Sequence, residues 1–200
     1  ASLMVEGHQF GGRHLFGRFE FCNIHCEYCD EVGKTGRAYD IDEVVDILKC
    51  LERESGPHRF VSLTGGEPLV YAPFLKRLLP RLKDEGFFTY LETNGILYRA
   101  LQDILQWVDA VAMDVKPASV TKERSFLREH REFLRQSLQI DGRNRETFIK
   151  MVCSKEIDLN EFGELCTMVA QESRKVILVL QPVSLEVEGH LDFELTGLLE

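Results

Sequence analysis

The sequence carries the stretch Phe21-Cys22-Asn23-Ile24-His25-Cys26-Glu27-Tyr28-Cys29-Asp30, in which three cysteines are spaced Cys-x3-Cys-x2-Cys. A loop this short gathers three thiols around one compact object. Three thiolates can hold a four-iron cluster while one iron is left without a protein ligand, and such an open iron can bind and reduce another molecule. We therefore predict that Cys22, Cys26 and Cys29 ligate a 4Fe-4S cluster.

Closely spaced cysteines also occur in zinc sites and in disulfide frameworks. Structural zinc takes four ligands, usually as two separated pairs, and only His25 within the same loop could be the fourth. An extracellular disulfide framework is not expected, because no secretory segment precedes the cysteines. The remaining thiols, Cys50, Cys153 and Cys166, are scattered through the chain. We expect these three to be buried apolar residues rather than ligands.

Strand-like and helical segments alternate along the chain. Short apolar runs predict strands, and apolar residues at helical spacing predict helices. The expected strands are 15–21, 60–63, 87–91, 110–115, 147–153 and 176–180, and the expected helices are 42–54, 72–85, 98–107, 122–138 and 159–172. Such alternation implies parallel strands with right-handed crossovers. Six strands predict an α/β fold, a partial (βα)6 TIM-like open barrel, in a single domain over residues 1–200.

Polar loop motifs follow the predicted strands at 64–68, 92–95, 114–117 and 181–183. Barrels of this kind build their sites at the carboxyl ends of the strands, so these loops and the cysteine loop should surround one mouth. Taken alone, the glycine pair Gly65-Gly66 favours an ordinary turn before a helix. Asp114 and Lys116 alone are compatible with a surface ion pair.

Together, the cysteine loop and Gly65-Gly66-Glu67-Pro68 resemble radical S-adenosylmethionine (SAM) enzymes, and this resemblance implies their open half-barrel. In these enzymes the amino and carboxylate groups of SAM chelate the open iron. The resemblance implies that Tyr28 lies beside the adenine and that the Gly65-Gly66-Glu67 backbone binds the methionine ammonium. It places Glu92 and Asn94 on the ribose side, and it adds to the SAM pocket Asp30, Asp114, Val115, Lys116 and Gln181.

The N-terminal segment Glu6-Gly7-His8-Gln9-Phe10-Gly11-Gly12-Arg13, followed by Phe16-Gly17-Arg18-Phe19, resembles the opening of 7-carboxy-7-deazaguanine synthases. These enzymes convert 6-carboxy-5,6,7,8-tetrahydropterin to 7-carboxy-7-deazaguanine, a step toward queuosine. A 5′-deoxyadenosyl radical takes a hydrogen from the pterin, the ring contracts and ammonia leaves. The resemblance implies that Arg18 grips the substrate carboxylate, which suits its planar fork, and that the pterin is lined by Met4, Val5, Glu6 and Thr64.

The chain departs from this family in its opening, after its third cysteine and at its C-terminal end. Family members usually read Gln-Gly-Glu-Gly where this chain has Met4-Val5-Glu6-Gly7, so one amide contact to the pterin is lost. They usually carry a magnesium-binding Thr after the Cys-Asp pair, where this chain has Glu31. A carboxylate is a competent hard-oxygen ligand, so Glu31 is the candidate ligand for Mg²⁺. Family members also usually continue further, which predicts that a C-terminal piece is missing.

The formal net charge of −9 argues against a general nucleic-acid partner, which needs a basic stripe. No apolar run is long enough to span a bilayer, so we expect no membrane partner. Reduced thiols and the lack of an export signal predict a cytoplasmic location. The expected partners are the pterin, an external electron donor such as flavodoxin, and a second copy in a homodimer. The alternatives are another radical SAM enzyme, such as a glycyl-radical activase, and a non-catalytic metal-binding module.

Overall fold

A computed structural model describes residues 2–4, 11–29, 33–139, 145–183, 185–187 and 190–192. Seven strands form one sheet in the order in which they occur along the chain. They are β1 (Ser2–Leu3), β2 (Arg13–Phe19), β3 (Phe60–Gly65), β4 (Thr89–Thr93), β5 (Ala110–Val115), β6 (Glu146–Cys153) and β7 (Ile177–Pro182). β1 pairs antiparallel with β2, and all later neighbours are parallel. The predicted six-stranded open barrel is therefore confirmed, and one antiparallel edge strand is added to it.

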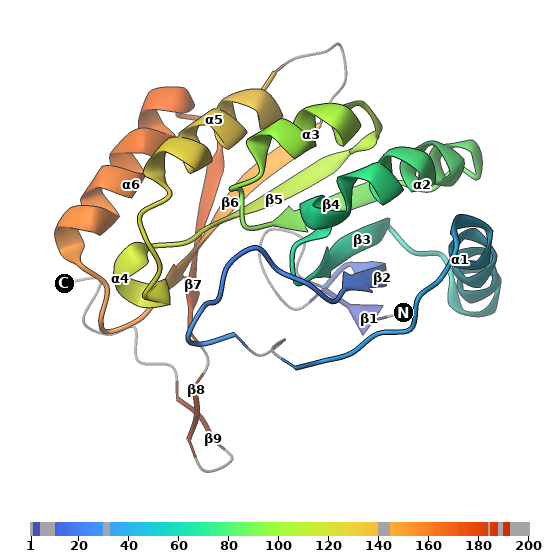
Figure 1. Cartoon of the computed structure of the whole chain (residues 1–200), viewed down its shortest axis with the longest axis horizontal. Helices are drawn as coiled ribbons and strands as arrows, with labels where there is room; N and C mark the ends of the chain where they lie inside the picture. The colour runs from blue at the N-terminus through green and yellow to red at the C-terminus, as the bar shows by residue number, and fades with distance from the viewer. Residues whose placement is uncertain are drawn as a thin grey trace.

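The helices that connect the parallel strands cover one face of the sheet (Figure 1). They are α1 (Ile41–Ser55), α2 (Ala72–Asp84), α3 (Tyr98–Ile104), α4 (Ala118–Thr121), α5 (Leu127–Ser137) and α6 (Leu159–Glu172). Two 3-10 turns, Pro68–Tyr71 and Leu105–Trp107, flank α2 and α3. Each crossover returns the chain to the same end of the sheet before the next strand begins, and this makes the strands parallel. A small separate sheet pairs β8 (Leu185–Val187) with β9 (His190–Asp192).

One predicted helix is wrong in its extent. The charged segment 122–138 was expected to form a single helix, but α4 ends at Lys122, which adopts a left-handed conformation with φ of 62°. The carboxylate of Glu161 accepts hydrogen bonds from the backbone N–H groups of Ala118 and Ser119, at 2.6 and 2.9 Å, and fixes the start of α4. A separate helix, α5, then begins at Leu127. The predicted helix is therefore shortened at its start, because the backbone leaves helical geometry at Lys122 and re-enters it only at Leu127.

The alternation of side chains across each strand divides the core into two parts. The larger cluster fills the space between the sheet and the helices and includes Leu15, Leu63, Leu91 and Val111. A smaller cluster lies on the opposite, inner face and consists of Met4, Phe60, Tyr90, Ala110, Ala112 and Phe148. Phe60, Ala110 and Phe148 lie near the starts of their strands, so apolar residues fill the amino half of the inner face. The carboxyl half is left for polar side chains.

His14 is a buried polar residue of this inner face. Its side chain is fully buried, its Nδ1 lies 2.7 Å from Ser62 Oγ, and its ring packs against Phe60 and Tyr90. Burial lowers the pKa of His14 to about 4, so the ring is neutral near pH 7. Among the helices that the structure describes, none is both long enough and apolar enough to cross a bilayer.

Candidate active site

A cavity of about 480 Å³ lies at the carboxyl ends of the strands, on the inner face of the sheet. All five predicted loop segments contribute to it, which confirms that they meet at one mouth. Of the predicted site residues, it is lined by Met4, Arg18, Cys22, Cys26, Tyr28, Cys29, Thr64, Gly65, Gly66, Glu92, Asn94, Asp114, Lys116 and Gln181. Pockets of roughly 300–1,000 Å³ suit small-molecule ligands.

The glycine pair at the end of β3 fixes the entrance to the cysteine loop. The N–H of Gly66 donates to the Phe19 carbonyl at 2.7 Å, and the N–H of Glu67 donates to the Phe21 carbonyl at 2.8 Å. Gly65 has a φ of 105°, and a Cβ there would lie 2.4 Å from backbone atoms of Phe19. A Cβ on Gly66 would lie 2.3 Å from the Phe21 carbonyl oxygen. Both glycines are therefore required by close approach of the chain that leads into the cysteines.

The far side of the cysteine loop is held by the segments after β4 and β5. Asn94 donates from Nδ2 to Asn23 Oδ1 at 2.7 Å. The backbone N–H of His25 donates to Glu123 Oε1 at 2.8 Å. The loop is thus tied to the ends of three different strands, and the position of its thiols depends on the whole mouth rather than on local sequence alone.

The three loop thiols differ in their exposure. Cys26 is buried, whereas Cys22 and Cys29 are exposed. Burial raises the pKa of Cys26 to about 11 and also raises that of Cys22. A thiolate is the form that binds metal, so an electropositive group must offset this burial. Among the residues described, no three His, Cys, Asp or Glu side chains are arranged to meet on a single metal ion.

The scattered cysteines only partly match expectation. Cys153 is buried and Cys166 is partly buried, but Cys50 is exposed on α1. The thiol of Cys50 donates to Glu54 Oε1 at 3.3 Å, one helical turn away. The prediction of burial was therefore wrong for Cys50, since the amphipathic pattern of α1 places this residue on its solvent face.

Glu67 lies behind the wall of the cavity rather than in it. Its side chain is fully buried and accepts hydrogen bonds from Leu69 N, Thr93 Oγ1 and Asn94 N, at 2.9, 2.9 and 2.8 Å. Burial raises the pKa of Glu67 to about 7, and these hydrogen bonds oppose that rise. The carboxylate joins the loop after β3 to the loop after β4, so its side chain serves the geometry of both motifs.

Asp114, Lys116 and Tyr28 form a charged cluster on one wall of the cavity. Lys116 Nζ lies 2.8 Å from Asp114 Oδ2 and 3.5 Å from the Tyr28 hydroxyl. Burial is the largest single influence and lowers the pKa of Lys116, but the combined effect of Asp114, Tyr28 and Cys26 outweighs it, so the pKa of Lys116 is raised. The other carboxylate oxygen, Asp114 Oδ1, is buried with no hydrogen-bond partner among the residues described. An acceptor in this state can take a donor from a ligand.

Sequence reasoning missed Lys150, which lines the cavity from β6. Its ammonium forms an ion pair with Glu92 Oε1, and Thr64 Oγ1 donates to Glu92 Oε2 at 3.0 Å. The available signal was a lone lysine within the otherwise apolar run 147–153. Phe16 and Val152 also line the cavity without having been predicted.

Other predicted residues do not reach the cavity or cannot be placed. Val115 is fully buried in the core between sheet and helices, because it points to the opposite face of β5 from Asp114. Its side chain therefore lies behind the cavity wall and does not line the cavity, whereas the resemblance placed Val115 in the pocket. Val5, Glu6, Asp30 and Glu31 lie outside the described residues.

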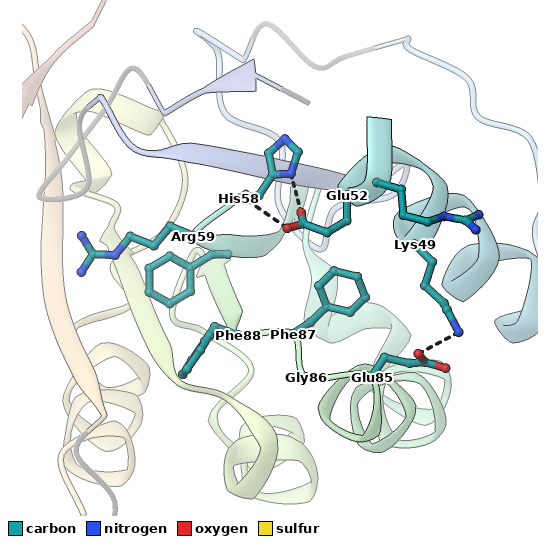
Figure 2. Close-up of a pocket in the computed structure, with 10 residues that line it drawn as sticks. Lys49, Glu52, His58, Arg59, Glu85, Gly86, Phe87 and Phe88 are labelled. Atoms are coloured by element: carbon teal, nitrogen blue, oxygen red, sulfur yellow. Dashed lines mark hydrogen bonds and ion pairs between the residues drawn. The ribbon is translucent and has the colours of Figure 1, made fainter. Parts of the chain in front are cut away.

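A second cavity, of about 320 Å³, lies at the amino-terminal ends of the strands (Figure 2). Its charged groups largely pair with one another. His58 Nδ1 lies 2.5 Å from Glu52 Oε2, and Lys49 Nζ lies 2.7 Å from Glu85 Oε2. The aromatic rings of Phe60, Phe87 and Phe88 supply its apolar walls. None of the predicted site residues lines it, so the mouth with the three thiols is the candidate active site.

Comparison with known proteins agrees with this geometry. Residues 18–167 match the Radical SAM superfamily. The chain is 32% identical over 204 residues to 7-carboxy-7-deazaguanine synthase of Geobacter sulfurreducens, covering 92% of this chain and 79% of that protein. It is 27% identical to the Methanocaldococcus jannaschii enzyme of the same name, covering 92% of this chain and 80% of the relative.

Among solved structures, Streptococcus suis SuiB bound to precursor peptide SuiA matches with a TM-score of 0.66 at 15% identity. The match covers 86% of this chain and 39% of SuiB, and it supports the fold alone. The chain belongs to the radical SAM superfamily and, within it, to the family of the 7-carboxy-7-deazaguanine synthases.

Proposed function

We propose that this chain converts 6-carboxy-5,6,7,8-tetrahydropterin to 7-carboxy-7-deazaguanine with loss of ammonia, a step toward queuosine. The observation that carries the proposal is the 32% identity to a synthase of that name over 92% of this chain. The cavity supports the proposal. It is lined by the Arg18 guanidinium, which suits a carboxylate, and by three thiols, which suit a cluster. Membership of the superfamily implies a 4Fe-4S cluster and SAM as cofactors.

The cluster ligands in this proposal are Cys22, Cys26 and Cys29. Three thiols lining one cavity fit a cluster that keeps one open iron. When bound, the cluster and SAM supply a radical that removes hydrogen from the substrate. The protein's own part is to hold the cysteine loop in place through Gly65, Gly66 and Asn94 and to orient both small molecules.

SAM would occupy the side of the cavity built by β4, β5 and β7. The unpaired Asp114 Oδ1 is a suitable acceptor for an ammonium or hydroxyl donor, and Glu92 is a second carboxylate nearby. Tyr28 offers an aromatic ring that Lys116 already approaches at 5.5 Å. Gly65, Gly66, Asn94 and Gln181 complete this wall, with no side chain from the glycines to block the ligand.

The pterin would lie on the β1–β3 side of the cavity. Arg18 and Thr64 are register partners on β2 and β3 and face the cavity together with Met4. Arg18 can bind both oxygens of a carboxylate in a fixed plane, which orients the rest of the ring. A hydroxyl such as that of Thr64 can both donate to and accept from a pterin edge.

We also propose that Glu31 ligates Mg²⁺ together with substrate oxygens. Magnesium prefers oxygen ligands and keeps several waters, so one carboxylate can suffice. Glu31 follows Cys29-Asp30 and so belongs to the cysteine loop that borders the cavity. Turnover that needs Mg²⁺ and is weakened by Glu31→Gln is expected, while turnover independent of Mg²⁺ would rule this ligand out. An external donor such as flavodoxin is proposed to supply the electron.

The test is incubation of the reduced, reconstituted protein with SAM and the carboxypterin, with products read by mass. We expect 7-carboxy-7-deazaguanine and ammonia, because the pterin loses only ammonia in this conversion and the hydrogen that is abstracted must be returned. Cleavage of SAM with the pterin left intact would favour another radical SAM reaction, such as glycyl-radical activation of a partner protein. Zinc binding with no SAM cleavage would favour a metal-binding module.

A further inference from the structure

Lys150 is a buried cation that the proposed chemistry does not yet use. Only 4% of its side chain is exposed, compared with 20% for its partner Glu92. A buried ammonium is costly unless it is paired, so its position within a cavity wall calls for an explanation. The partner is one of the residues expected on the ribose side of SAM. The pair therefore lies where SAM and the pterin would meet.

The arrangement of side chains on the sheet allows Lys150 to reach Glu92 across the intervening strand. Glu92 lies on β4 and Lys150 on β6, with β5 between them. The residue of β5 in register with Glu92 is Ala112, which is fully buried on the same inner face. A methyl side chain leaves room for the lysine stem to pass over β5, and a larger residue would fill this space. The ion pair thus spans three strands.

Both oxygens of Glu92 are engaged from inside the protein. Oε1 receives the ammonium of Lys150, and Oε2 accepts the Thr64 hydroxyl at 3.0 Å. A carboxylate held in this way has a fixed rotamer and still has lone pairs for further donors. Vicinal ribose hydroxyls are donors of this kind.

We propose that Lys150 is a positioning residue that holds the Glu92 carboxylate in the orientation that binds the ribose hydroxyls of SAM. The inference rests on the part of the proposed function that assigns Glu92 to SAM. It does not require that the substrate be a pterin. Lys150 acts through Glu92, so removal of the Lys150 ammonium should weaken the binding of SAM.

The experiment measures SAM affinity by anaerobic titration calorimetry on the reconstituted protein without pterin. Lys150→Met keeps the stem and removes the charge, and Glu92→Gln removes the carboxylate. We expect each to weaken SAM binding about tenfold, and the double variant to be no worse than either single variant, because both remove one interaction. Lys150→Arg should stay within about threefold of the wild type.

A second ligand separates positioning from general damage. The 2′,3′-dideoxy analogue of SAM lacks the hydroxyls, so the wild type should bind it less tightly than SAM, whereas Lys150→Met should bind the two about equally. The matched control is Lys83→Met, which removes a lysine paired with Asp109 at 2.5 Å near the amino ends of the strands and should leave SAM affinity unchanged.

Three results would overturn the proposal. One is wild-type SAM affinity in Lys150→Met. Another is a double variant whose loss equals the product of the two single losses. The third is failure of both Lys150→Met and Lys150→Gln to take up a cluster while Glu92→Gln does so normally, since the lysine would then serve folding. Because no pterin is used, failure to form a deazaguanine would contradict the proposed function without deciding this test.

Discussion

At the scale of single residues, Arg18 is the side chain that most directly tests the substrate assignment. It faces the cavity from β2, with its guanidinium carbon 5.4 Å from the Phe16 ring. Arg18 is exposed, so the bond in question is one that a bound substrate would bury, and loss of a buried, charged hydrogen bond typically costs about 2–5 kcal/mol. We predict that Arg18→Ala raises KM for the carboxypterin at least thirtyfold in steady-state assays, while cluster content and uncoupled SAM cleavage are unchanged.

Arg18→Lys is the control for charge without the planar fork. It should recover only part of the affinity, because an ammonium cannot bind both carboxylate oxygens in one plane. Saturation of Arg18→Ala at the wild-type pterin concentration would show that another residue binds the carboxylate.

Sequence reasoning at this scale succeeded for side chains that point into the mouth and failed where a side chain points elsewhere. Asn94, Asp114 and Lys116 line the cavity as predicted, because each lies at or just after the carboxyl end of a strand. The side-chain contacts of Glu67 were not predicted, since only the folded chain shows that its carboxylate accepts hydrogen bonds from Thr93 and Asn94. Lys150 was missed because its partner is two strands away.

At the scale of structural elements, the junction of β3 with the cysteine loop should tolerate no side chain. A Cβ on Gly66 would lie 2.3 Å from the carbonyl oxygen of Phe21, which is backbone and cannot rotate away. We predict that Gly66→Ala displaces the cysteine loop. Iron content after anaerobic reconstitution should fall several-fold, while the helical circular dichroism signal is retained.

Gly163→Ala is the matched control for this change. Gly163 lies within α6, and a Cβ there meets nothing within 4 Å. Alanine is a better helix former than glycine, so the free energy of unfolding should rise by roughly 0.5–1 kcal/mol with iron content unchanged. Full iron content in Gly66→Ala would contradict the close approach described here.

The elements themselves were largely predictable, but their ends were not. Alternation of apolar runs gave the strands, yet β2 spans Arg13–Phe19 rather than 15–21 because it begins where β1 pairs with it. The short helix α4 begins where the Glu161 carboxylate, 43 residues away along the chain, accepts from the backbone N–H of Ala118. Local patterns carry no information about such distant partners.

At the scale of the whole molecule, two buried histidines make stability depend on pH. Burial lowers the pKa of both His14 and His130 to about 4, from 6.5 in the unfolded chain. The unfolded state therefore binds more protons between these values, and stability present above pH 6.5 is lost as the pH falls toward 4. Each residue should contribute a loss of up to about 2 kcal/mol between pH 6.5 and 5.

Urea unfolding of the wild type, His14→Asn and His130→Gln at pH 7 and pH 5 tests this. His14→Asn keeps a polar atom near Ser62 Oγ, and His130→Gln keeps a donor for the Asn94 carbonyl, which His130 Nε2 reaches at 3.1 Å. Each variant should lose less stability than the wild type between the two pH values. An unchanged difference would mean that the replaced histidine is already protonated in the folded state or does not titrate in this range.

The half-barrel as a whole followed from the order of strands and helices, because parallel strands with right-handed crossovers leave few topologies. The antiparallel β1 was not predicted, since a strand of two residues is too short to show the alternation of apolar and polar side chains that identifies a strand. The meeting of five distant loops at one mouth was predictable, because the carboxyl ends of parallel strands all lie at the same end of the sheet.

The central claim is that the cysteine loop at this mouth holds a SAM-cleaving cluster. Its most direct test is the amount of 5′-deoxyadenosine formed from SAM by reduced, reconstituted single-alanine variants of all six cysteines. We predict cleavage at near the wild-type level after Cys50→Ala, Cys153→Ala and Cys166→Ala, and none after Cys22→Ala, Cys26→Ala or Cys29→Ala. Full cleavage by Cys26→Ala, with its iron retained, would contradict the account.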